Sequence, residues 1–423
     1  MKKSAIFIAV LLLALTALPS AEAAFVIGGE NGWQFSTDGF INVFAVYQTL
    51  EKAPTNVAPV EGFLSGNSSR TATAGTPVPT DGGATQQFQV RTGLLPEGVG
   101  FNIKAPTIGG VDMGVRIGIY PNIQNHIDSN IDITPNIDFR EIYFTAEGKY
   151  GQLLAGRAIN LYQAKNILTD MTLFGAGVVG PVNAGPTMGH IGYGYLYPNF
   201  GAQIRYTTPN MDGFKVAISV NDSQSIGNAV AGIYASTINV PKLETEISYA
   251  TGRTQGWLSA LYQTASFPGN SAARASGSAT SLGGAGGVST GFGPVDVLAS
   301  GWGGQGLGLS AVQWDVFGAA LDNVGKERKT FGGLGQVVYK INDSWKTGVN
   351  YGLNYAEETN QDKLDTAAGS AHIKSQQAVS AMITYNLNKN LQFIGEYSWA
   401  QDQFYNGQSQ ASNIFALGTF FYW

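Results

Sequence analysis

The sequence predicts an all-β protein, a transmembrane antiparallel β-barrel, and three observations lead to this fold class. Apolar and polar residues alternate with a period of two over segments of about ten residues, the length that a tilted strand needs to cross a bilayer. Only 13% of the 423 residues are charged, yet the mean hydropathy is -0.00. The connections between the segments alternate between short and long, as they do in membrane barrels.

The N-terminus predicts export. Residues 1–23 have the features of a signal peptide: two lysines, an apolar stretch at 5–15, and Ala21-Glu22-Ala23 as a small-x-small cleavage sequence. Cleavage after Ala23 would leave 24–423 as a single outer-membrane β-barrel domain. Because the apolar stretch is shorter than the ~20 residues of a spanning helix, a polytopic helical membrane protein is excluded. The net charge of -5 gives no support for nucleic-acid binding.

The alternation is clearest in residues 111–120, where one parity holds only valine, methionine and isoleucine. It recurs in 345–355, 376–385 and 391–399. A soluble sandwich would alternate in the same way, but it has no reason to keep the strict order of short and long connections. Aromatic residues at segment ends predict an interfacial girdle. They are Tyr47, Tyr120, Trp257, Trp345, Tyr355, Tyr385, Trp399 and Trp423.

The connections set the strand count. Short ones are expected at 107–110, 147–151, 209–213, 251–256, 341–344 and 386–390, and long ones at 49–85, 121–136, 159–199, 221–241, 266–294, 356–374 and 402–411. Counted from a first strand at Phe40–Gln48, they define sixteen strands if 295–326 supplies one hairpin. The tract 266–293 is rich in glycine, serine and alanine and is expected to be a loop. The last strand, 413–423, is expected to turn Phe415, Leu417, Phe421 and Trp423 towards lipid.

Four stretches resemble the Gram-negative general diffusion porins. Residues 205–209 (Arg-Tyr-Thr-Thr-Pro), followed by Gly213-Phe214, resemble the strand-turn-strand signature that follows the constriction loop in that family. Residues 150–157, 385–389 and the aromatic end 418–423 agree with the family in the same order. The chain departs from the pattern at its last residue, which is tryptophan instead of phenylalanine, and in the late turn, where an asparagine replaces the usual arginine.

The resemblance implies a sixteen-stranded homotrimer in the outer membrane, with outer-membrane lipids around it and an internal loop in each pore. It also implies passive diffusion of small hydrophilic solutes and ions through a water-filled barrel. No cofactor is implied.

The candidate site is the lining of such a pore. The polar parity holds a row of basic residues, which the resemblance implies would face the inserted loop 159–199 across the narrow zone. Asp170 is the single acid of that loop. The expected pore-lining set is Arg91, Lys104, Arg116, Arg140, Arg157 and Asp170. Alternatively, the basic residues only hydrate the lumen and pair with Asp112, Asp138 or Glu141. Ile142 and Phe144 share the parity of Arg140, so a bulge is needed to turn Arg140 inward.

Other chemistries find little support. The three histidines, His126, His190 and His372, fall in expected loops without metal-ligand spacing, and no nucleophile-elbow motif occurs, so no enzyme is predicted. Residues 128–132 carry alternate acids, as calcium loops do, but lack the later glycine and glutamate, so no metal is assigned. The glycine pattern at 301–306 is expected by chance in a chain with 56 glycines. The chain has no cysteine, which excludes disulfides and thiolate metal sites.

Besides an outer-membrane hydrolase, which would need the loop histidines, two alternative functions remain open at this stage. One is a substrate-specific channel on the same fold, in which loop tyrosines such as Tyr193, Tyr195 and Tyr197 form a binding track. The other is a non-conducting structural or adhesive barrel with a plugged lumen. Lumen-facing glycines argue against a filled interior; examples are Gly114, Gly118, Gly348 and Gly352. The choice between anions and cations stays open, with a weak inclination towards anions because the predicted wall is basic.

Overall fold

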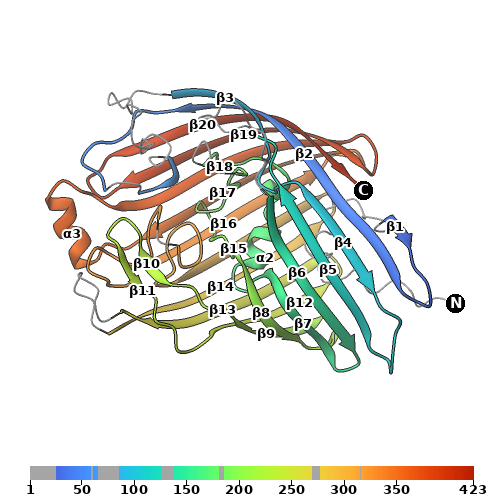
Figure 1. The fold of residues 1–423 in the computed structure, drawn as a ribbon. Coiled ribbons are helices and arrows are strands. Elements are labelled where there is room, and N and C mark those ends of the chain that lie inside the picture. The colour runs from blue at the N-terminus through green and yellow to red at the C-terminus, as the bar shows by residue number, and fades with distance from the viewer. Residues whose placement is uncertain are drawn as a thin grey trace.

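The structure, a computed structural model, describes residues 25–58, 61–64, 85–124, 137–180, 185–268, 277–314 and 316–423. The predicted signal peptide lies outside these residues. Most of the described chain forms one antiparallel sheet that closes on itself (Figure 1). Among the described helices, none is long and apolar enough to cross a membrane.

The barrel has sixteen strands, as the sequence predicts. The first is β2 (Gln34–Leu50), preceded by the short β1 (Phe25–Gly28), which pairs only with the start of β2. The others are β3 (Thr85–Arg91), β4 (Gly98–Lys104), β5 (Asp112–Pro121), β6 (Ile137–Gly148), β7 (Gly151–Ile159), β8 (Phe200–Thr207), β9 (Phe214–Asn221), β12 (Lys242–Thr251), β13 (Thr254–Ser266), β14 (Ser278–Phe292), β15 (Val295–Gln305), β16 (Lys329–Lys340), β17 (Trp345–Ala356), β18 (Ile373–Asn386), β19 (Leu391–Phe404) and β20 (Ser409–Tyr422). Both β3 and β4 pair with β2 and count as one interrupted strand. On its other side β2 pairs with β20, and this pairing closes the ring.

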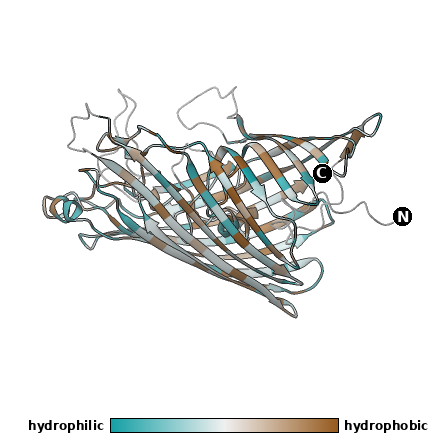
Figure 2. Ribbon diagram, turned by 90° about the horizontal axis from the view of Figure 1, so that it is seen from below, coloured by the Kyte–Doolittle hydropathy of each residue, from teal (hydrophilic) through white to brown (hydrophobic). Residues whose placement is uncertain are grey.

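The two parities of the strands form an apolar outer face and a polar inner face. On β20, Phe415, Leu417 and Phe421 are exposed on the outside, as predicted, and hydrophobic segments recur on neighbouring strands in Figure 2. The predicted girdle is only partly correct. Trp345 and Tyr385 lie against each other on the outside, with ring centroids 4.6 Å apart. Tyr120 and Trp257 point inward instead, because they share the parity of lumen-facing neighbours.

Two predictions between residues 266 and 328 are wrong. The tract expected to be a loop contains the fifteen-residue strand β14, and the long connection lies at 306–328, where the hairpin 295–326 would have placed a strand. The composition was misleading because β14 is held by backbone ladders to β13 and β15 on both sides. In a closed barrel these ladders satisfy the backbone whatever the side chains are. Strands β14 and β15 therefore form the hairpin that was expected at 295–326.

The long connections gather at one end of the barrel and the short turns at the other (Figure 1). The first group carries a small hairpin of β10 (Ile226–Asn228) and β11 (Ile233–Ala235), and the helix α3 (Asn360–Ala367). In membrane barrels the long loops face the outside of the cell, so this end is the external mouth.

Candidate pore and its lining

The connection between β7 and β8, residues 160–199, packs against the inner face of the barrel wall. It contains α2 (Ala164–Leu168) and the 3-10 helix η1 (Met171–Phe174), and Figure 1 shows α2 within the ring of strands. We call residues 160–180 and 185–199 the internal loop; 181–184 lie outside the described residues.

The internal loop begins with contacts to β12 and β13. The backbone N–H groups of Leu161 and Tyr162 donate to one oxygen of Glu244, at 2.7 and 3.0 Å. The Trp257 indole donates to the Asn166 side chain at 3.0 Å. These hydrogen bonds are buried, so they hold the start of the loop firmly to the wall.

The loop continues along β16 to β19. Asp170 accepts hydrogen bonds from Tyr195 within the loop at 2.7 Å and from Asn350 of β17 at 2.8 Å. The Tyr193 hydroxyl donates to Asp402 of β19 at 2.8 Å. Tyr193 and Tyr195 are fully buried, so these two tyrosines fasten the loop to the wall and offer no binding track along the lumen.

Glycines on the inner face allow the loop to approach this closely. A Cβ at Gly352 would lie 1.8 Å from the Tyr193 carbonyl oxygen, and a Cβ at Gly348 would lie 2.8 Å from the Met171 sulfur. The sequence-based view that such glycines indicate empty space is therefore wrong on β17. The space that they leave is filled by the internal loop.

On the opposite wall, Arg116 of β5 is the centre of a charged group. Its guanidinium contacts Asp38 of β2 at 2.8 Å and Glu141 of β6 at 2.7 Å, and it donates to the Asn102 side chain at 3.0 Å. The Tyr120 hydroxyl also donates to Glu141. The side chain of Asp38 is 36% exposed, whereas those of Arg116 and Glu141 are 15% and 4% exposed. Asp38 is thus the most exposed of these three charged side chains.

Arg140 is turned inward by a bulge, as the parity of its neighbours requires. The β5–β6 register shifts between Gly118 and Tyr120, and Phe139 faces outward. The Arg140 guanidinium contacts Asp138 at 2.6 Å and donates to the Tyr197 hydroxyl of the internal loop at 3.3 Å. Asp138 is 48% exposed against 19% for Arg140, so here too the carboxylate is the more accessible charge.

The other predicted lining residues are placed differently. Lys104 shares the inward parity of Asn102, two residues nearer the short turns. Arg91 faces inward but is fully buried, and it donates to the Gly185 carbonyl of the internal loop at 2.8 Å. The exposed Arg157 pairs in register with Ile142 and Ala202 on the outward parity.

The structure therefore brings Arg116, Arg140 and Lys104 to one inner wall and leaves Arg157 outside it. Asp170 is not among them either. It is 3% exposed and is satisfied by the internal loop and β17, away from the basic row.

Sequence reasoning missed the interruption between β3 and β4, residues 92–97. Asn42 of β2 organises it: its backbone N–H donates to Glu97 at 2.6 Å, and its side chain accepts from the Gly93 N–H at 2.7 Å. Leu94 then donates its N–H to Gly175 of the internal loop at 2.9 Å. The interruption thus supports the loop from the side opposite β17. The sequence Gly93-Leu94-Leu95-Pro96 could have indicated this interruption, because proline has no backbone N–H to donate to the hydrogen-bond ladder of a sheet.

Further charge pairs lie near the start of the internal loop. Lys165 of α2 approaches Glu246 at 3.6 Å, and Lys242 approaches Glu244 at 3.4 Å. Lys165 is 23% exposed, so the accessible charge that the described part of the loop offers is basic.

The two described histidines, His190 and His372, lie in different parts of the molecule. His190 is buried in the internal loop and contacts the Tyr193 carbonyl at 3.0 Å and the Ser380 hydroxyl at 2.9 Å. His372 lies at the mouth beside Asp362 and Asp365, three side chains of metal-ligating types. His126 and the calcium-like stretch 128–132 lie outside the described residues.

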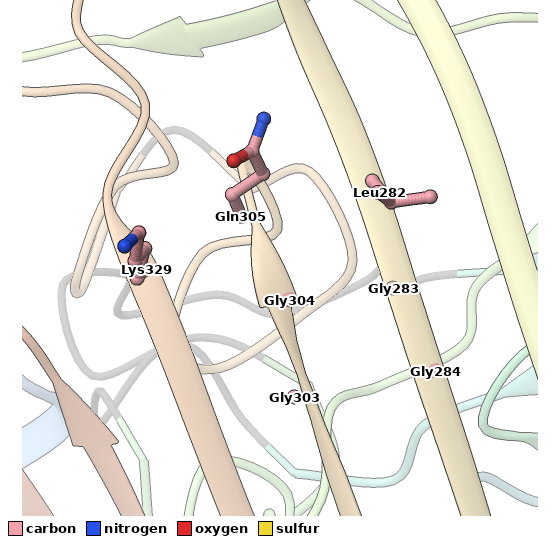
Figure 3. A pocket seen from close by; sticks show the side chains of 7 residues that line it. All are labelled: Leu282, Gly283, Gly284, Gly303, Gly304, Gln305 and Lys329. Carbon is pink, nitrogen blue, oxygen red and sulfur yellow. The ribbon is translucent and has the colours of Figure 1, made fainter.

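A hollow also lies on the outer face of the wall, over β14, β15 and β16 (Figure 3). It is lined by Leu282, Gln305, Lys329 and the glycines 283, 284, 303 and 304. Leu282, Gln305 and Lys329 lie side by side in register on the outward parity. This hollow is therefore separate from the lumen.

The closed wall, its apolar outer face and its polar lumen define a membrane channel of the β-barrel class. Residues 9–403 match a family described as Gram-negative porin. The chain belongs to this family, and it is an outer-membrane channel for the passive diffusion of small hydrophilic solutes.

Solved structures agree on the fold. The outer membrane channel DcaP of Acinetobacter baumannii is 16% identical with a TM-score of 0.66, covering 95% of this chain and all of that one. An anion-selective porin from Comamonas acidovorans is 14% identical with a TM-score of 0.59, covering 92% and 100%. OmpF of Salmonella typhi, in complex with daunomycin, is 13% identical with a TM-score of 0.51, covering 92% and 98%. No match was found among curated protein sequences.

Proposed function

We propose that the internal loop narrows the lumen and that solutes pass between it and the wall formed by β2 and β4–β6. The supporting observation is that the internal loop makes most of its contacts with one side of the barrel. Most of the hydrogen bonds that fasten the loop go to β12, β13 and β16–β19. On the other side the loop is reached by Arg91, Leu94 and Arg140. Arg116, Asp38 and Asp138 on the other side keep solvent-exposed charged groups.

The exposed charges along this passage favour the opposite ion selectivity from the weak anion preference inferred from the sequence. Each lumen-facing arginine at this wall is paired, and the more exposed partners are the carboxylates of Asp38 and Asp138. The internal loop presents Lys165, while its acid, Asp170, is buried. We therefore propose a weak preference for cations and polar neutral solutes, because the accessible wall charge sets the sign of the field in a wet pore.

The remaining expectations belong to the same proposal. The mature chain would begin at Ala24 after removal of residues 1–23, form a single barrel domain, assemble as a homotrimer among outer-membrane lipids, and act without a cofactor and without catalysing a reaction. The buried state of Tyr193 and Tyr195 favours general diffusion over a tyrosine binding track.

Reconstitution tests this function. Purified oligomers in a planar bilayer should give stepwise conductance, and a salt gradient should give a small reversal potential of the sign expected for cation preference. Correctly folded, heat-modifiable oligomers without any conductance would contradict it and would favour the structural-barrel alternative.

A further inference from the structure

A chain of four buried polar side chains joins the internal loop to β18 and β19. Its members are Glu396 and Ser398 of β19, Ser380 of β18 and His190 of the internal loop. Both serines and His190 are fully buried, and Glu396 is 7% exposed. We call these four residues the buried relay.

The buried relay is continuous from one end to the other. A carboxyl oxygen of Glu396 is 3.1 Å from the Ser398 hydroxyl, and the Ser398 and Ser380 hydroxyls are 2.6 Å apart. The Ser380 hydroxyl is 2.9 Å from Nε2 of His190. On the other side of the ring, Nδ1 is 3.0 Å from the Tyr193 carbonyl oxygen. The relay therefore makes three side-chain contacts and ends on the backbone of the internal loop.

Both ends of the buried relay hold the internal loop. At one end, the Glu396 carboxyl accepts the backbone N–H groups of Ala176 at 3.1 Å and of Gly177 at 2.5 Å. At the other end, His190 belongs to the arm of the loop that returns towards β8. The two arms also pair with each other, since the Gly189 N–H donates to the Ala176 carbonyl at 3.1 Å. The relay thus fastens two arms of one hairpin of the loop to the same wall.

This hairpin reaches across the lumen to the interruption between β3 and β4. Leu94 donates its N–H to the Gly175 carbonyl, and Thr187 donates its N–H to the Gly93 carbonyl, each at 2.9 Å. The arms that the buried relay fastens to β18 and β19 are therefore the arms that cross to the opposite wall. Loss of the relay would remove hydrogen bonds from both arms at once.

The contacts of the buried relay fix the number of hydrogens that it holds. Each of the three contacts between Glu396 and Nε2 of His190 takes one hydrogen, and the two serine hydroxyls supply two. The third hydrogen must be a proton on Glu396 or on Nε2. Because the Tyr193 carbonyl can only accept, Nδ1 carries a hydrogen in either case. Without this proton two acceptors would face each other at one contact, and with a second proton two hydrogens would.

A proton on Glu396 leaves every member of the buried relay neutral. The carboxylic acid then donates to Ser398, Ser398 donates to Ser380, and Ser380 donates to Nε2 of His190. In the alternative, Ser398 donates to a carboxylate and His190 is an imidazolium, with its ring near the Asn350 side chain. That arrangement separates two buried charges by two hydroxyl groups, which is strongly unfavourable.

The surroundings of Glu396 also favour the neutral acid. Its register partners are Met382 on β18 and Ala416 on β20, and both are apolar and buried. In the described part of the chain, its hydrogen-bond partners are backbone N–H groups and Ser398, without a lysine or an arginine. Asp170 is the charged group that acts on both ends of the relay, and its carboxylate disfavours a second negative charge on Glu396.

We propose that Glu396 is a neutral carboxylic acid that shares its proton with His190 through the buried relay, and that the relay positions the internal loop without adding charge to the lumen. The positioning role rests on the proposed function, since the loop that the relay holds narrows the same lumen. A channel without the relay closes more often, because the freed hairpin can move into the passage.

Infrared difference spectroscopy of the purified full-length oligomer tests the shared proton. At about pH 7 an ordinary carboxyl group is ionised, so the spectrum of the wild type minus that of Glu396→Gln should contain the C=O band of one additional carboxylic acid. Ser398→Ala removes the acceptor of the acid's O–H and should shift this band. The control Ser412→Ala, equally buried on β20 and hydrogen-bonded to Gln48, should leave the band unchanged.

The comparison of Ser398→Ala with the wild type does not depend on the folding of Glu396→Gln. Absence of the carboxylic acid band would overturn the proposal. A band at the same position in Ser398→Ala and in the wild type would overturn it as well, because the acid would then not donate into the relay.

Single-channel recording tests the positioning role. Ser398→Ala and Ser380→Ala should each raise the fraction of time that the channel is closed by about tenfold, the change expected when a buried hydrogen bond is lost and its partner is left unsatisfied. Ser412→Ala should keep the wild-type value, and closure as rare as in the wild type in both relay variants would overturn the positioning role. The infrared result needs no conduction, so oligomers that show the expected bands but never conduct would contradict only the proposed function.

Discussion

Arg116→Ala removes the cation that lies between Asp38 and Glu141, at 2.8 and 2.7 Å, and leaves both carboxylates at the lumen wall. One unit charge changes the energy of a monovalent ion passing at about 7 Å by about 0.6 kcal/mol in water. Screening at physiological salt reduces this to about 0.25 kcal/mol, and cations and anions shift in opposite directions. The cation-to-anion permeability ratio should therefore rise about two- to threefold at 0.15 M salt and about fivefold at 0.01 M.

The assay is the reversal potential across a planar bilayer in a salt gradient, measured at both salt concentrations. Arg116→Lys keeps the charge and should stay near the wild-type ratio. Asp38→Asn removes the most exposed carboxylate of the group and should lower the ratio. An Arg116→Ala channel with the wild-type ratio at both salt concentrations would refute the reasoning, because it would mean that permeating ions do not pass this wall.

Two further predictions concern the packing of the loop and the processing of the chain. Gly352→Ala would place a Cβ 1.8 Å from the Tyr193 carbonyl, and the resulting overpacking should cost about 1–3 kcal/mol, visible as a lower temperature of heat modification. The control Gly335→Ala meets open space on the outer face and should leave that temperature unchanged; equal effects of the two changes would contradict the placement of the loop. Mass spectrometry of the exported protein should find Ala24 as its first residue, and a retained N-terminus would exclude cleavage after Ala23.

The period of two predicted the barrel because lipid on one side and water on the other impose opposite polarities on successive side chains. It failed at β14, whose inner and outer faces are both rich in glycine. There Gly283 and Gly287 make room for Tyr162 and Trp257, and a Cβ at either glycine would come within 2.6 Å of these side chains. Glycine is needed at these positions because residues distant in sequence pack against them. These contacts cannot be inferred from the local composition.

For the pore lining, the sequence predicts which side chains of a single strand face the lumen. It does not predict which side chains of different strands form pairs. The inward turn of Arg140 followed from the polarity of its neighbours once a bulge was allowed. The pairing of Arg116 with Asp38 joins residues 78 apart in sequence, and the burial of Asp170 depends on Asn350, 180 residues away. In the structure, Arg116 and Arg140 of the predicted basic row are therefore ion-paired, and the more exposed partners are the acids Asp38 and Asp138.

If solutes pass between the internal loop and the wall, they pass Arg116. The chain has no cysteine, so Arg116→Cys offers a single thiol for a bulky water-soluble thiol reagent during single-channel recording. We expect a stepwise fall in conductance on modification, with no effect of the same reagent on the outward-facing control Gly335→Cys. Complete modification of Arg116→Cys with unchanged conductance would contradict it.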